Sequence, residues 1–586
     1  MAHRSLTTRR MAARFTAGLV AVALALPIQA FAASPAPVAA ENGMVVTAQR
    51  LASQVGVDIL KSGGNAVDAA VAVGYALAVV YPTAGNLGGG GFMTIRLKDG
   101  RTTFLDFRER APGRATKDMY LGPDGNPVDG LSTDGYLAVG VPGSVAGLEY
   151  AREHYGSKER PALIAPAIAL ARDGFALSPG DVESFLSGNA DLARDPAAAA
   201  VFLKNGSEPY RVGERLVQTD LASTLQTISD RGADGFYRGP AASAITQASA
   251  AHGGILEAQD FADYKVRELA PVTCDYKGYR IDSSPPPSSG GVIICEILNI
   301  LEGYPLAYTG FGSAETVHWM VEAMRYAFVD RNSALGDPDF VKNPVEKLLS
   351  DDYAASIRAK IAPYRAGVSA ALKPAGMGES TETTHYSIID RDGNAVAVTY
   401  TLNGSFGARV MAPGTGVLLN NEMDDFTQKP GVPNLYGLVQ GEANAIAPRK
   451  TPLSSMSPTI LSKDGAPVMV IGSPGGSRII TITLEAILNV VEHGMTIQEA
   501  IDAPRIHHQW QPDRVTIEPR ALSPDTIRLL AGMGYDVRED PDWPIWGEAA
   551  GILVGGPSLK TPSPNGTDRY FGAIDSRATA GAAIGY

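Results

Sequence analysis

The 586-residue sequence has only two cysteines and lacks the motifs of several common enzyme classes. Cys274 and Cys295 are too few for a disulfide-rich scaffold or a cysteine-rich zinc site. The local sequence does not place a histidine or another basic partner against either thiol, so we expect them to be structural or free rather than catalytic. His507 and His508 would point to opposite faces of a strand, which disfavours joint metal ligation.

Motif searches exclude further chemistries. There is no G-x-S-x-G or S-x-x-K motif, so the usual serine acylases lack their signature. There is no Gly-Lys dipeptide, so no Walker A loop is present, and neither H-E-x-x-H nor C-x-x-C occurs. The sequence therefore predicts no metal centre and no bound cofactor.

Basic residues are fewer than acidic ones, 50 against 62, and the net charge is −12. A surplus of negative charge argues against nucleic acid and anionic membranes as main partners. Hydrophobic residues make up 45% of the chain, which is enough for a sizeable core.

Long hydrophobic runs are scarce, and the first lies at the N-terminus. Arginines precede an apolar run over residues 15–26, and Ala30-Phe31-Ala32 fits a small-x-small cleavage site. The run is shorter than the roughly 20 residues of a membrane-spanning helix. We therefore predict a secretory signal peptide over residues 1–32 and a mature chain, without a membrane span, in the periplasm or outside the cell.

Hairpin and helix patterns alternate along the mature chain. Asp-Gly turns between β-branched runs predict β-hairpins over residues 92–107, 385–400 and 459–471. Length and spacing predict helices over residues 52–61, 66–79, 315–334 and 479–491. Hairpins interspersed with helices favour antiparallel sheet covered by helices.

A candidate nucleophile, Thr384, lies where a small, polar segment meets a predicted strand. Residues 365–382 predict an exposed flexible loop or an interdomain linker. If the bond before Thr384 breaks, its α-amino group is released beside its own hydroxyl. An α-amine with a pKa of about 7.7–8.0 can act as a base, so one residue supplies nucleophile and base. The plain alternative is an ordinary threonine that opens a strand.

Eight long segments stand out along the chain: GGNAVDAAVAVGYALAVVYP, GNLGGGGFM, LDFRERAP, SPPPSSGG, TTHYSIIDRDGNAVAVTYTLN, LLNNEMDDF, PLSSMSPTI and GSPGGSRIITITLEAILNVV. Together they resemble γ-glutamyltranspeptidases of the N-terminal nucleophile hydrolase superfamily, and the resemblance runs from about Glu41 to the C-terminus. It implies an α+β fold, a four-layer αββα sandwich of two stacked antiparallel sheets flanked by helices. It also implies self-cleavage between Thr383 and Thr384 into a large subunit, 33–383, and a small subunit, 384–586, which form a heterodimer.

The resemblance implies the catalytic roles. Thr384 would be the nucleophile in cleavage and turnover, and Thr401 would hydrogen-bond it. Gly475 and Gly476 would offer backbone N–H groups to the oxyanion. Their loop leads into a predicted helix, whose N-terminus favours negative charge. The alternatives are an outward-facing strand residue for Thr401 and a helix-capping turn for the glycines.

A γ-glutamyl group presents a free α-carboxylate, for which the resemblance implies Arg108. Guanidinium binds carboxylate bidentately, and Ser454 and Ser455 would be hydroxyl partners. The alternative for Arg108 is a surface ion pair with a nearby acid such as Glu109.

The α-ammonium of the same group needs acceptors, which the resemblance places at Asn403, Glu422 and Asp425. Tyr436 resembles the lid residue that covers the pocket in bacterial members. The alternative for both acids is a solvated acidic turn. Relatives that act as glutaryl-cephalosporin acylases tend to lack an acid at Asp425, so its presence favours γ-glutamyl substrates.

The implied function is a self-processing γ-glutamyltransferase and glutathione hydrolase. Glutathione and other γ-glutamyl compounds would be donors, and amino acids or dipeptides would be acceptors. One alternative is an amidase of the same fold that acts on glutaryl-cephalosporins or poly-γ-glutamate. Another is a non-catalytic periplasmic amino-acid-binding protein, against which Thr384 and the Gly475-Gly476 turn argue.

Overall fold

The computed structural model describes residues 34–372, 383–540 and 546–586. The predicted signal peptide at 1–32 and residues 373–382 of the predicted loop lie outside these ranges. Residues 37–586 form a single unit, which contains every helix and strand of the described chain. Within the described ranges, no helix combines the length and apolar character that a membrane crossing requires.

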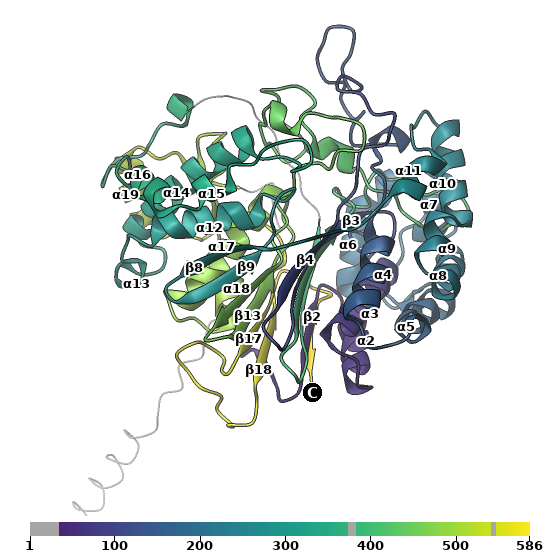
Figure 1. Cartoon of the computed structure of the whole chain (residues 1–586), viewed down its shortest axis with the longest axis horizontal. Helices are drawn as coiled ribbons and strands as arrows, with labels where there is room; N and C mark the ends of the chain where they lie inside the picture. Colours follow the sequence, from purple (N-terminus) through teal and green to yellow (C-terminus); the bar gives the residue numbers. More distant parts are fainter. Residues whose placement is uncertain (1–33, 373–382, 541–545) are drawn as a thin grey trace, which may run out of the picture. The chain divides into compact units, whose positions relative to one another are not determined.

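Two seven-stranded antiparallel sheets stack face to face at the centre of this unit (Figure 1). The first has the order β1 (Val38–Ala40), β18 (Tyr570–Ile574), β17 (Ala550–Val554), β13 (Ala466–Gly472), β12 (Thr459–Lys463), β9 (Tyr279–Ser283) and β8 (Val272–Tyr276). The second has the order β19 (Ala582–Gly585), β2 (Met44–Thr47), β10 (Thr384–Ile389), β11 (Ala395–Thr401), β3 (Gly90–Arg96), β4 (Thr102–Phe107) and β7 (Arg267–Leu269). Small sheets add β5 (Phe175–Ala176) with β6 (Arg215–Leu216), and β14 (Ile506–His507), β15 (Val515–Ile517) and β16 (Val537–Glu539).

Helices cover the outer face of each sheet (Figure 1). Those on the first sheet's side are α12 (Gly290–Leu301), α13 (Leu306–Thr309), α14 (Ala314–Ala334), α15 (Val345–Leu348), α16 (Asp351–Arg358), α17 (Ile479–Val491), α18 (Ile497–Asp502) and α19 (Pro524–Met533). Those on the second sheet's side are α2 (Arg50–Lys61), α3 (Ala66–Val80), α4 (Ser144–Tyr155), α5 (Arg160–Asp173), α6 (Pro179–Leu192), α7 (Pro196–Phe202), α8 (Thr219–Arg231), α9 (Ala233–Tyr237), α10 (Pro240–Ala251) and α11 (Ala258–Asp263). The predicted αββα sandwich is confirmed.

Side chains that point alternately to the two faces of the central strands explain how these strands join neighbouring layers. In β10, Tyr386 and Ile388 pack into the core beneath the helices, whereas Ile389 joins the core between the sheets. In β11, Val396 and Val398 take the helix side. Because successive side chains of a strand point to opposite faces, a strand buried on both faces joins two cores.

The predicted hairpins and helices are present, with small shifts at their ends. Helix α3 extends to Val80 and stops before Pro82, which lacks the N–H that a longer helix would need. Strand β3 begins at Gly90, two residues earlier than predicted, because Gly90 and Gly91 pair with β11. A Cβ on Gly91 would lie 2.4 Å from Tyr400 Cβ, so the close approach requires glycine.

Of the predicted exposed flexible loop over residues 365–382, Arg365, Val368, Ala370 and Ala371 are exposed as expected, but the prediction is wrong at Ser369. Ser369 is buried, its N–H donates to Asp513 Oδ2 at 2.7 Å, and its carbonyl accepts from Trp510 Nε1 at 3.0 Å. Gly367 N donates to Glu322 Oε1 at 3.0 Å. These partners are distant in sequence, so composition alone does not reveal the anchoring.

Each sheet contains strands from both sides of the predicted cleavage point before Thr384. In the second sheet β10 lies between β2, which precedes it by more than 300 residues, and β11. In the first sheet β12 pairs with both β9 and β13. A chain cut before Thr384 would therefore remain joined by ladders of hydrogen bonds.

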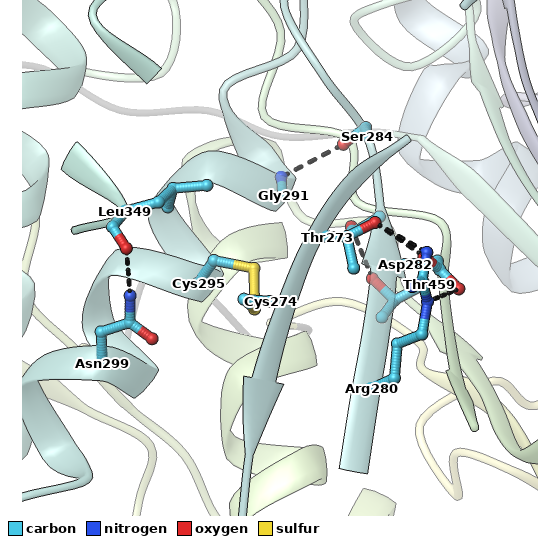
Figure 2. Close-up of a disulfide and its surroundings, with 11 residues drawn as sticks. Thr273, Cys274, Arg280, Asp282, Ser284, Gly291, Cys295, Asn299, Leu349 and Thr459 are labelled. Carbon is cyan, nitrogen blue, oxygen red and sulfur yellow. Dashed lines mark hydrogen bonds and ion pairs between the residues drawn. A yellow bond between two sulfur atoms is a disulfide. The ribbon is translucent and has the colours of Figure 1, made fainter. Parts of the chain in front are cut away.

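Cys274 and Cys295 form a disulfide that ties the edge strand β8 to helix α12 (Figure 2). Their Cα atoms lie 5.8 Å apart, and both residues are buried. Farther along α12, Asn299 Nδ2 donates to the Leu349 carbonyl at 2.9 Å. Of the two expectations for the cysteines, structural or free, the structure supports the structural one.

Candidate active site

Most of the predicted site residues line one pocket, and the two that do not, Thr384 and Gly475, directly adjoin lining residues in the sequence. The pocket lies between the end of β11, a 3₁₀ turn at Glu422–Asp425 and the N-terminal end of α17. The space, including its open mouth, is about 280 Å³. Ten of its lining residues carry predicted roles: Arg108, Thr383, Thr401, Asn403, Glu422, Asp425, Tyr436, Ser454, Ser455 and Gly476.

Thr384 follows one of these lining residues and opens β10. Its side chain is buried, and its hydroxyl oxygen has no hydrogen-bond partner among the described residues. Thr383 Oγ1 lies 3.3 Å from Thr401 Oγ1, which also accepts a 2.8 Å bond from Asn403 N. In the uncut chain, Thr401 therefore contacts the residue before the predicted cleavage point.

His385 is adjacent to Thr384 but is held elsewhere. Its Nδ1 lies 2.8 Å from Thr399 Oγ1, and its Nε2 lies 3.1 Å from Ser387 Oγ. Burial lowers the pKa of His385 to about 3, so the ring is neutral at physiological pH. Because both ring nitrogens face other hydroxyls, His385 is no base for Thr384 in this arrangement.

The Gly475-Gly476 turn leads into α17 as predicted. Gly475 has φ +135° and Gly476 has φ +55°, a region that residues with a Cβ seldom adopt. A short 3₁₀ turn, Gly476–Arg478, continues into the helix. The N-terminus of a helix carries partial positive charge, so an anion near Gly476 would be stabilised.

Arg108 is buried and paired with two acids of the 3₁₀ turn. Its Nη1 lies 2.6 Å from Glu422 Oε1, and its Nη2 pairs with Asp425. Its Nε also donates to the Pro452 carbonyl at 3.0 Å. The alternatives of a surface ion pair with Glu109 and of a solvated acidic turn are therefore wrong, because all three groups are almost fully buried.

The serines predicted to assist Arg108 have other partners in this structure. Ser455 Oγ accepts from Arg331 Nη2 at 2.9 Å, and Ser454 Oγ accepts from Met456 N at 3.1 Å. Both line the pocket with Arg108 without bonding to it.

Arg331, on α14, is a second pocket cation that the sequence reasoning missed. Burial lowers the pKa of Arg331 to about 10, against the opposing effect of Asp425. An arginine in the last turn of a helix is common and carries no functional signal. Only the packing of α14 over the pocket reveals it.

Glu109 is a buried acid in addition to Glu422 and Asp425. In the sequence, only its position within the motif LDFRERAP indicated that it lies near the site. Burial raises the pKa of Glu109 well above its usual value, and the charge on Glu422 raises it further. Burial also raises the pKa values of Glu422 and Asp425, whereas Arg108 lowers them. A ligand that carries both a carboxylate and an ammonium could replace these ion pairs. Its carboxylate would bind Arg108, and its ammonium would bind the two acids that Arg108 now holds.

Tyr436 covers Asn403. The Tyr436 hydroxyl oxygen lies 2.8 Å from the Asn403 carbonyl oxygen and 2.5 Å from its Oδ1. Asn403 Nδ2 donates to the Asn421 carbonyl at 3.0 Å, and Asn403 has φ +78°. Both side chains are buried, so this wall of the pocket is closed in the present structure.

Comparisons with known proteins identify the family of the chain. The sequence model of the gamma-glutamyltranspeptidase family matches residues 52–583. A glutathione hydrolase proenzyme from a Pseudomonas species is 60% identical over 98% of this chain and 99% of that protein. One from Escherichia coli is 49% identical over 94% and 93%, respectively.

A solved structure shares the fold. The crystal structure of a cephalosporin acylase from Bacillus halodurans superimposes with a TM-score of 0.81. The two chains are 28% identical, and the match covers 96% of this chain and 99% of the other. On the family match and the two identities, the chain belongs to the gamma-glutamyltranspeptidase family.

Proposed function

We propose that this enzyme is a self-processing γ-glutamyltransferase and glutathione hydrolase with Thr384 as its nucleophile. One observation carries the proposal: Thr383, the residue before the predicted cleavage point, lines the same pocket as Gly476 and the buried pair of Arg108 with Asp425. The glutathione hydrolase proenzymes reported above support the choice of substrate.

Maturation would begin with attack of the Thr384 hydroxyl oxygen on the Thr383 carbonyl carbon. The C–N bond between the two residues breaks, an ester forms, and the nitrogen becomes the free α-amine of Thr384. Water then hydrolyses the ester and leaves a carboxylate on Thr383. The products are a large subunit, 33–383, and a small subunit, 384–586, held as a heterodimer by their shared sheets.

Turnover would use the released α-amine as base. It takes the proton of the Thr384 hydroxyl as the oxygen attacks the γ-glutamyl amide, and the leaving amine receives a proton. Backbone N–H groups of Gly475 and Gly476 would stabilise the oxyanion. Water then releases glutamate from the acyl-enzyme, or the amine of an amino acid or dipeptide takes the γ-glutamyl group. Thr401 would hydrogen-bond the nucleophile.

On substrate binding, ion pairs with the γ-glutamyl group would replace those between Arg108 and the two acids. The α-carboxylate of the γ-glutamyl group takes Arg108, assisted by Ser454 and Ser455, and the α-ammonium takes Asp425 and Glu422 with Asn403. Tyr436 would act as the lid. Charge-assisted bonds to both ends of the zwitterion compensate for the separation of the resting pair.

The predicted leader at 1–32 supports secretion, so the enzyme would act in the periplasm or outside the cell.

The test is kinetic. Purified enzyme should hydrolyse glutathione to glutamate and cysteinylglycine, and added glycylglycine should yield γ-glutamyl-glycylglycine. Two bands on a denaturing gel would separate this enzyme from the amino-acid-binding alternative, since a binding protein has no reason to split. Absence of glutathione turnover in a fully cleaved preparation would reject the proposal.

The fold shared with a cephalosporin acylase favours one second candidate, an amidase for glutaryl groups. A glutaryl group lacks the α-ammonium, so it would leave buried Asp425 facing methylene groups. A kcat/KM for glutaryl amides above that for glutathione would support the second candidate.

A further inference from the structure

A second cavity lies in the helical layer on the outer face of the first sheet. Its walls come from α14, α17 and α18, and from the segment before β14. The space, including its open mouth, is about 560 Å³. Apolar side chains dominate the walls: Val317, Met320, Ile482, Leu488, Ile501 and Leu522.

The mouth is marked by an aromatic pair. Phe311 lines the cavity and is 43% exposed, and its ring lies edge-on to that of His493, with centroids 5.8 Å apart. An exposed phenylalanine at the entrance offers an apolar surface to a ligand that enters from solvent.

One wall residue, Glu485 of α17, is an unpaired acid. Its side chain is buried, with 8% of the residue exposed. Its Oε1 accepts from Ile506 N at 3.0 Å, but its Oε2 has no hydrogen-bond partner among the described residues. A buried carboxylate oxygen without a donor costs free energy that a ligand donor would recover.

The neighbouring cations are already engaged by other acids. Arg505 pairs with Asp575, and Arg577 pairs with Glu518 at 2.6 Å and with Asp575 at 2.8 Å. Burial raises the pKa of Glu485 to about 8, as expected for an acid that lacks a paired cation. Because no cation of the described chain pairs with Glu485, a cationic ligand that donates to its Oε2 would stabilise the charged carboxylate.

We propose that this cavity is a second small-molecule site, which binds an apolar amine whose nitrogen donates to Glu485 Oε2 and whose hydrocarbon body lies among the helix side chains. An amine fits better than an alcohol, because a charge-assisted bond to a carboxylate is stronger than a neutral one.

The cavity also shares a wall with the Gly475 turn. A Cβ on Gly475 would lie 3.0 Å from Ile482 Cδ1, so Ile482 packs directly against the turn while it lines the cavity. An occupant that displaces Ile482 acts on this turn and changes the rate of turnover. This link to rate rests on the proposed function, whereas binding itself does not.

The binding test uses benzylamine as the probe with the mature enzyme. Crystals soaked in benzylamine should place its nitrogen within hydrogen-bond distance of Glu485 Oε2, and calorimetry should give its Kd. Glu485→Gln preserves the acceptor for Ile506 N but removes the charge, and should weaken binding about tenfold. Glu492→Gln is the matched control, because Glu492 bonds Tyr276 outside the cavity, and should leave the Kd unchanged.

A second variant, Ala486→Phe, fills the cavity and should abolish binding. Because overpacking can unfold a core, the thermal unfolding of Ala486→Phe is measured first. If Ala486→Phe does not fold, the Glu485→Gln variant still tests the site. In the wild type, benzylamine should change the rate of glutathione hydrolysis. The Glu485→Gln variant should require an about tenfold higher benzylamine concentration for the same change in rate.

Benzylamine density only in the active-site pocket, or an unchanged Kd in Glu485→Gln, would overturn the site. Binding in the cavity with no change in rate would overturn the link to turnover. If the enzyme failed to act on glutathione, the soaked crystals and the Kd would still decide the site, so the two failures are distinguishable.

Discussion

Thr383 Oγ1 and Thr401 Oγ1 lie 3.3 Å apart, across the start of the β10–β11 ladder. Thr401 is the last residue of β11, and Thr384 pairs with Tyr400 in the register of the two strands. The predicted cleavage point therefore lies at the end of a central ladder. A backbone break at this point removes no strand from the sheet. Thr401 already lies beside the predicted cleavage point.

The first prediction concerns maturation. Thr384→Ala removes the attacking oxygen and should leave one uncut chain, whereas Thr384→Ser retains a hydroxyl and should still split. A denaturing gel with N-terminal sequencing of the smaller fragment is the measurement, with Thr384 expected as its first residue. Cleavage of the alanine variant at this bond would indicate an external protease.

The second prediction concerns Arg108. Arg108→Ala should raise KM for γ-glutamyl substrates by about 10- to 200-fold, since a hydrogen bond to a charged group contributes about 1.5–3 kcal/mol. The variant should also lose stability, because Glu422 and Asp425 would remain buried without their cation. Arg110→Ala is the matched control, because Arg110 bonds the Lys265 carbonyl instead. An unchanged KM in fully cleaved Arg108→Ala would remove this arginine from substrate binding.

The third prediction concerns specificity at Asp425. Asp425→Asn preserves the size and removes the charge that would face the α-ammonium. Glutathione should lose kcat/KM, while glutaryl amides, which lack the ammonium, should gain relative to it. The measurement is the ratio of the two kcat/KM values, because it cancels differences in active fraction. A ratio that stays constant would show that Asp425 does not select the ammonium.

The fourth prediction concerns the disulfide. Cys274 and Cys295 are 21 residues apart in the sequence. A disulfide that closes a loop of this length lowers the conformational entropy of the unfolded chain, and should thereby stabilise the fold by about 3 kcal/mol. Replacing both cysteines by alanine should therefore lower the unfolding temperature. Dithiothreitol should lower it for the wild type and leave the double variant unaffected. Equal unfolding temperatures in wild type and variant would contradict a stabilising role.

The fifth prediction concerns pH. Burial raises the folded-state pKa of Glu485 to about 8, above its unfolded value of about 4.3. The unfolded chain then binds fewer protons than the folded one between these values, so stability falls as pH rises through this window. Glu485→Gln removes this loss, so its unfolding temperature should exceed that of the wild type most clearly at pH 8–9. An equal difference at pH 4 and pH 9 would contradict the raised pKa.

The sequence by itself determined the elements and the family. Asp-Gly turns predicted the hairpins, and the helix over 479–491 was predicted with the bounds that the structure has. These features depend on turn chemistry and side-chain periodicity, which act over a few residues. The ordered motifs indicated the γ-glutamyltranspeptidase family, and through it ten pocket residues.

Only the tertiary structure decided how those residues are paired. Arg108 and Asp425 are 317 positions apart, and no local pattern indicates that each neutralises the other. Arg331 reaches the pocket because α14 packs over it, and Ser369 is held by Asp513 and Trp510 rather than lying in a free loop. Ion pairs and buried hydrogen bonds depend on the distances that folding creates between remote segments. Their partners therefore follow from how the layers pack, and the order of residues along the chain does not reveal them.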